Sequence, residues 1–89
     1  MRTKDIDVEI SAAGNIVVPA YLALLAKGYA VTCQRSDNSE TWTAENALGR
    51  FTANDPITLL GVVNVAELRG QNWHASDSEI EAFVTKFRE

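Results

Sequence analysis

The single histidine of the chain, His74, is the first residue to weigh as a catalytic group. An imidazole acts as a general base when a carboxylate orients it, and Asp77 follows three residues later. No recognisable motif places a nucleophile beside this pair, and a catalytic site needs several convergent groups. The pattern therefore favours a loop histidine that precedes a helix, and we assign no residue a catalytic role.

The only cysteine, Cys33, falls in an alternating pattern typical of a strand, on the same side as Tyr29 and Val31. A cysteine becomes reactive in an electropositive, partly exposed setting, and Arg35 is the one cation on that side. A small buried hydrophobe is the commoner role of a free cysteine. Since one cysteine cannot form an internal disulfide, nothing points to an oxidising compartment, and we expect a cytoplasmic protein.

Two acidic stretches offer carboxylates to a metal ion. Asp5, Asp7 and Glu9 alternate along an expected strand, and residues 37–40 form an acidic turn. Ca²⁺ requires six to eight oxygens from a loop of defined spacing, which neither stretch has. One cysteine and one histidine cannot supply a zinc site, and five isolated glycines do not make a phosphate-binding loop. The sequence therefore predicts no metal and no cofactor. The acidic residues instead suit a solvated face, and on a strand they would also discourage pairing at a sheet edge.

The element around which the chain is organised is the helix predicted over residues 55–70. Asp55 can cap the first turn, Pro56 lacks an amide hydrogen where none is needed, and Gly70 can close the helix. Apolar side chains occur on nearly all sides, with Leu59 and Leu60 on opposite ones. We therefore expect this helix to be covered on two sides, by a sheet and by either the C-terminal helix or a second copy of the chain.

The other predicted elements follow from hydrophobic periodicity. Alternation over residues 6–10 predicts a first strand, and an apolar face over 19–27 predicts a short helix. An antiparallel meander of three strands is predicted over residues 29–34, 41–44 and 50–53. Ser76 and Glu79 have the spacing of a capping box, and apolar residues at helical spacing follow them.

Together these elements predict a single α+β domain over residues 1–89. We expect about four mostly antiparallel strands, in the order β-α-β-β-β-α-α, with the helices packed on one face of the sheet. A chain of 89 residues buries only about 60–65% of the surface that its unfolded form exposes, so its stability is expected to be modest unless it oligomerises.

Charge and hydropathy disfavour several classes of partner. Eight basic and twelve acidic residues give a net charge of -4, and the basic residues are dispersed. Nucleic acids and anionic membranes both require a positive patch, so we expect neither as a partner. The longest uncharged run, residues 10–26, is broken by glycine, asparagine and proline, and the acids before it do not suit a signal peptide. We therefore predict no membrane-spanning and no targeting segment.

Two functions remain. The first is a small acidic non-enzymatic protein that binds another protein or itself, as a homodimer, through the helix of residues 55–70 or the C-terminal helix. Leu60 and Trp73 are the expected interaction residues, and size and charge alone suggest an accessory or immunity-like role. The alternative is a small-ligand-binding module or minor enzyme with a pocket between the sheet and the helices. The expected pocket residues are Tyr29, Cys33, Trp42 and His74.

Overall fold

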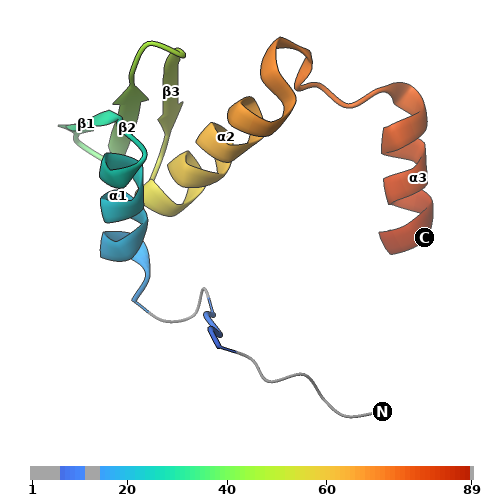
Figure 1. The fold of residues 1–89 in the computed structure, drawn as a ribbon, viewed down its shortest axis with the longest axis horizontal. Coiled ribbons are helices and arrows are strands. Elements are labelled where there is room, and N and C mark those ends of the chain that lie inside the picture. Colours follow the sequence, from blue (N-terminus) through green and yellow to red (C-terminus); the bar gives the residue numbers. More distant parts are fainter. Residues whose placement is uncertain (1–6, 12–14, 89) are drawn as a thin grey trace.

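The computed structural model describes residues 7–11 and 15–88 of the chain. These residues form an α+β fold with a three-stranded antiparallel sheet and three helices (Figure 1). The elements in chain order are α1 (Val17–Ala26), β1 (Ala30–Ser36), β2 (Ser39–Glu45), β3 (Arg50–Ala53), α2 (Pro56–Arg69), the 3₁₀ turn η1 (Gly70–Asn72) and α3 (Asp77–Phe87). The structure thus confirms the α+β class and the antiparallel meander.

The sheet has one apolar and one polar face. Its strands lie in the order β1-β2-β3, and the register aligns Val31 with Ala44 and Ala44 with Phe51. Because side chains alternate along a strand, these three residues share one face. The opposite face carries Thr32 and Thr43 in register, with Thr52 beside them on β3. The sheet can therefore bury only one of its faces against helices.

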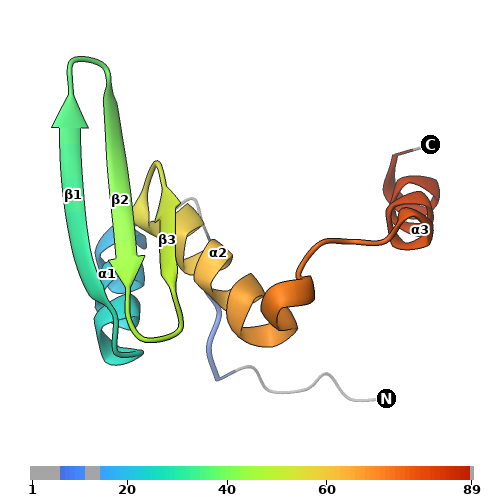
Figure 2. The ribbon, with the colours of Figure 1, turned by 90° about the horizontal axis from the view of Figure 1, so that it is seen from above.

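The core lies between the apolar face of the sheet and the helices α1 and α2, which pack against each other and against the strands (Figure 2). Five residues, each at most 3% exposed, form its centre: Leu24, Tyr29, Ala44, Leu59 and Val63. Helices α1 and α2 and strand β2 contribute to this set, together with Tyr29 just before β1, so the core joins the N-terminal and central parts of the chain.

The expected helix over residues 55–70 is confirmed together with its ends. The Asp55 side chain accepts a hydrogen bond from the Thr58 amide at 2.8 Å, and Pro56 is the first helical residue. The Thr58 hydroxyl donates to the other Asp55 oxygen at 3.0 Å, and these bonds lower the pKa of Asp55. Gly70 follows α2 with φ 69°, a backbone conformation that glycine adopts without strain.

The second cover of α2 differs from our prediction. We expected the C-terminal helix or a second copy on the side of Leu60, and the structure places α1 there. Leu60 is half-buried against the core, and on the same side Glu67 pairs with Lys27 from the end of α1, at 2.7 Å. The apolar pattern of α2 showed that two sides needed cover, but it carried no information about which element supplies it.

The strand expected over residues 6–10 is not confirmed. Residues 7–11 take neither strand nor helix conformation, and residue 6 lies outside the described residues. The described part of the chain therefore has three strands, in the order α-β-β-β-α-α. Alternation identifies side chains that would share a face, but a strand also needs a free sheet edge in register with it.

The expectation that the helices pack on one face of the sheet holds for α1 and α2 but not for α3. Figures 1 and 2 show α3 set apart from the rest of the chain. The packing between described elements joins α1, the three strands, α2 and η1, and α3 takes no substantial part in it. The apolar side of the C-terminal helix is therefore left without cover by the other elements that the structure describes.

Candidate functional site

The helix α3 is defined by its caps and not by burial. The Ser76 hydroxyl accepts a hydrogen bond from the Glu79 amide at 3.2 Å, and the Ser76 amide donates to the Glu79 carboxylate at 2.8 Å. This confirms the predicted capping box. The Ser76 amide and the nearby Arg69 guanidinium lower the pKa of Glu79. Such a helix has a well-defined start although none of its residues is buried.

One side of α3 is apolar and open to solvent. Its four residues lie at helical spacing and are between 44% and 63% exposed: Ile80, Phe83, Val84 and Phe87. We call these four residues the α3 face. The rings of Phe83 and Phe87 lie 5.2 Å apart, and the Arg88 guanidinium lies 5.7 Å from the Phe83 ring. The α3 face is therefore an exposed surface with two aromatic rings and with cations at its border.

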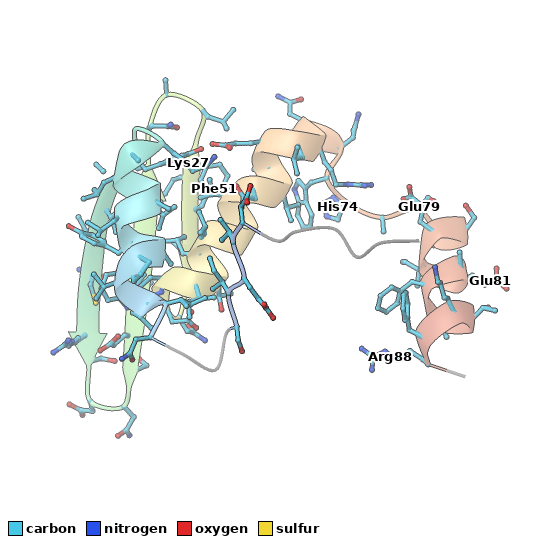
Figure 3. All side chains as sticks on the ribbon, turned by 60° about the horizontal axis from the view of Figure 1, so that its bottom comes forward. Lys27, Phe51, His74, Glu79, Glu81 and Arg88 are labelled. Carbon is cyan, nitrogen blue, oxygen red and sulfur yellow. The ribbon has the colours of Figure 1, made fainter. Side chains whose placement is uncertain are left out.

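The connection between α2 and α3 is held by Arg69. Its Nε donates to the Trp73 carbonyl at 2.9 Å, and its Nη2 donates to the His74 carbonyl at 3.2 Å. The same Nη2 pairs with the Glu79 carboxylate at 3.4 Å. The Trp73 and His74 rings are stacked, with centroids 3.7 Å apart. These contacts direct α3 away from the sheet (Figure 3).

A second apolar surface lies between α2 and the edge strand β3. A hollow of about 480 Å³ is lined by Arg50, Phe51, Thr52, Val62, Val65, Ala66 and Trp73. We call it the α2–β3 groove. Val62 and Val65 are 37% and 42% exposed, and Trp73 is half exposed. At 1.5 Å per helical residue α2 is about 21 Å long, whereas the four residues of β3 span about 13 Å, so part of α2 extends beyond the sheet.

Sequence reasoning expected Trp73 in an interaction surface but missed its neighbours in the groove. Val62 and Val65 belong to a helix that is apolar on nearly all sides, which favoured burial for both. The useful signal was the short β3, because a strand of four residues cannot cover a helix of fourteen. Leu60, the other expected interaction residue, lies half-buried against the core.

The four expected pocket residues lie in three settings. Cys33 is exposed on β1 and is aligned with Trp42, which is half-buried and donates from Nε1 to Glu40 at 2.9 Å. Tyr29 is buried at the start of the same hairpin. His74 lies in the connection beyond α2 (Figure 3). The structure therefore places Cys33 and Trp42 side by side and His74 on a separate segment.

Tyr29 belongs to a polar cluster that joins α1, β1 and α2. Its hydroxyl donates to Glu67 at 2.8 Å, and the other Glu67 oxygen pairs with Lys27. Burial raises the pKa of Tyr29, and the neighbouring Glu67 carboxylate adds to this shift. The Lys27 ammonium and the Tyr29 hydroxyl lower the pKa of Glu67. The cluster satisfies its own donors and acceptors, which suits a structural link and gives no free base.

Other classes of site find no support in the described residues. Within residues 7–11 and 15–88, no group of three or more His, Cys, Asp or Glu side chains is placed to hold a metal ion. None of the helices that the structure describes combines the length and apolar character needed to cross a membrane. Comparison with known proteins gives no match to a family model, to a curated protein or to a solved structure. The function must therefore be argued from the site itself.

Proposed function

We propose that this protein acts by binding another polypeptide through the α3 face, without catalysing a reaction. The observation that carries the proposal is the exposure of four large apolar side chains on one side of a capped helix. An apolar surface of this kind, bordered by charged residues, is typical of protein interaction sites. Phenylalanine side chains are suited to fill pockets on a partner, because each buries a large area.

The mode of binding that these residues favour is a helix seated in a groove. Residues at i, i+3, i+4 and i+7 anchor an amphipathic helix when its apolar side enters a complementary cleft. Ile80, Phe83, Val84 and Phe87 have that spacing. A net charge of -4 with dispersed basic residues favours a protein partner over a nucleic acid. The proposal includes a cytoplasmic setting and an accessory or immunity-like role.

A second candidate function is the binding of a small ligand in the α2–β3 groove. Its volume of about 480 Å³ lies within the range of small-molecule sites, and Arg50 and Trp73 offer a charge and an aromatic surface. The substitution Val65→Glu would abolish ligand binding at such a site, whereas Phe83→Glu would leave the ligand affinity unchanged. Protein binding through α3 requires Phe83 in every case, so these two variants separate the candidates.

The proposed function is tested by site-specific photo-cross-linking in the cells that produce the protein. A photoreactive benzoylphenylalanine replaces Phe83 in one variant and Ala82 in the control. Both positions are exposed on α3, but Ala82 lies about 100° from Phe83 around the helix and outside the α3 face. We expect a discrete polypeptide adduct from position 83 and little from position 82. If position 83 gives no polypeptide adduct, or both positions give the same diffuse products, binding through the α3 face is wrong.

A further inference from the structure

We infer that the partner of the α3 face is a second copy of this chain, and that two copies exchange their C-terminal helices. In this arrangement α3 of each copy lies in the α2–β3 groove of the other. The inference rests on the proposed function, because it identifies the partner of the same surface. It also accounts for the α2–β3 groove, which is a further exposed apolar surface among the described residues.

The first argument is the area that the isolated chain leaves exposed. Its accessible surface is 7385 Å², whereas a folded monomer of 9.7 kDa is expected to expose about 5,100 Å². Its radius of gyration is 16.3 Å, against about 12 Å for a compact chain of 89 residues. The α3 helix contributes to this excess, since none of its residues is buried. Obligate homodimers bury about 2,000 Å² or more in total, and the surfaces of α3 and of the groove are exposed and available to such an interface.

The second argument is the match between the α3 face and the α2–β3 groove. Both are mainly apolar, and the groove is lined by residues of α2, of β3 and of the connection after α2. Arg50 is the only charged residue in its lining. Arg50 pairs with Glu45 at 3.6 Å and remains largely exposed, whereas Glu79 is already paired with Arg69. Asp77 in the first turn of α3 therefore brings a further carboxylate to Arg50 when this end of α3 lies beside it.

The third argument is the direction of the connection, which favours a second copy over the chain's own α3. Trp73 lines the groove, and α3 begins only four residues later. For α3 to enter the groove of its own chain, the backbone must reverse between these points. That reversal would break the bonds of Arg69 to the Trp73 and His74 carbonyls and to Glu79. Short connections of this kind favour exchange of an element between copies.

Exchange also gives a closed assembly. Each copy offers one α3 face and one α2–β3 groove, and a twofold axis satisfies both pairs at once. No unpaired α3 or groove remains to recruit a third chain. The polar threonine face of the sheet stays in contact with water, as its composition requires.

The test uses two variants of the full chain that each break one half of the contact. Phe83→Glu places a charge on the α3 face, and Val65→Glu places one in the groove. The matched controls are Ala82→Glu on α3 and Asn64→Glu on α2, both exposed positions outside these surfaces. Sedimentation velocity over a dilution series measures the dimer affinity, and circular dichroism verifies that every variant is folded.

We expect a wild-type dimer, unchanged controls, and a loss of about 100-fold or more in dimer affinity for each of the two variants. The decisive sample is an equimolar mixture of Phe83→Glu and Val65→Glu. In an exchanged dimer of these two chains one contact is intact. The Phe83→Glu chain has an unaltered groove, and the Val65→Glu chain has an unaltered α3 that can enter it. A heterodimer in the mixture, tighter than either variant alone, supports the inference.

Three results overturn the exchange. If Val65→Glu dimerises like the wild type, and the mixture shows no tighter dimer than the variants alone, two α3 helices pair directly. If the wild type is a monomer with a radius of gyration near 12 Å in X-ray scattering, α3 occupies the groove of its own chain. If the wild type is an extended monomer and position 83 cross-links to a different polypeptide, the exchange is wrong while the proposed function stands. Should Val65→Glu fail to fold, Val65→Gln replaces it in the same mixture.

Discussion

Truncation of Leu59 and of Phe83 to alanine should have very different effects on the stability of the monomer. Leu59 is fully buried on α2, at the centre of the core, whereas Phe83 is half exposed on α3. Leu59→Ala removes three carbon atoms, worth about 2.5 kcal/mol by transfer alone, and the cavity left behind raises the cost to about 3–4 kcal/mol. Phe83→Ala should change the free energy of unfolding by less than about 0.5 kcal/mol.

These magnitudes are large compared with the stability of so small a domain. A chain of 89 residues is expected to have a free energy of unfolding of roughly 4–13 kcal/mol. Leu59→Ala should therefore lower the melting temperature by at least about 12 °C, since 1 kcal/mol corresponds to about 4–8 °C in a domain of this size. Urea unfolding followed by circular dichroism gives both free energies.

The comparison must be made at protein concentrations where sedimentation shows the wild type and both variants to be monomeric. Under those conditions α3 has no partner, and only the core contributes to the difference. Equal losses for the two variants would refute the placement of α3 outside the core. A loss below about 1 kcal/mol for Leu59→Ala would refute the position assigned to the core itself.

Two further predictions concern the caps and the polar cluster. Ser76→Ala should destabilise α3 by about 1 kcal/mol and lower the helical signal in circular dichroism. The urea unfolding of the core should stay unchanged. An unchanged helical signal would contradict the role given to the capping box. The pKa of Glu67 is lowered in the folded state, so at a given pH this carboxyl group binds fewer protons there than in the unfolded chain. Stability from this residue should be present above the ordinary glutamate pKa of about 4.3 and lost as the pH falls below it. Glu67→Gln should therefore flatten this part of the stability profile, and an identical profile in both proteins would remove Glu67 from the acid response.

Local signals in the sequence were sufficient to predict most of the secondary structure. Asp55 with Pro56 identified the start of α2, and Ser76 with Glu79 identified the start of α3. Each of these signals depends on side chains within three residues of the backbone groups that they satisfy. Such contacts do not depend on the tertiary structure of the rest of the chain, which explains why they could be predicted from the sequence.

Tertiary relations were harder to predict, and the failures have a common physical cause. The apolar pattern of α2 indicated two covered sides without showing that α1 is the second cover. The pattern of α3 indicated one apolar side without showing that the domain leaves it open. Alternation over residues 6–10 likewise indicated a face, but residues 7–10 pair with neither open edge of the sheet. In each case the sequence determines which surface needs cover, and the geometry of distant elements determines what provides it.

The length of α3 gives a further reason to couple its folding to association. Isolated helices shorter than about 12–15 residues are marginal in water, and α3 has eleven. Its capping box and its charged first and last turns favour the helix, but each contributes only about 1 kcal/mol. Burial of the α3 face in a groove adds the apolar contacts through which helices in proteins gain most of their stability. The helix and its interface should therefore form together, so that the fraction of ordered α3 follows the concentration of its partner.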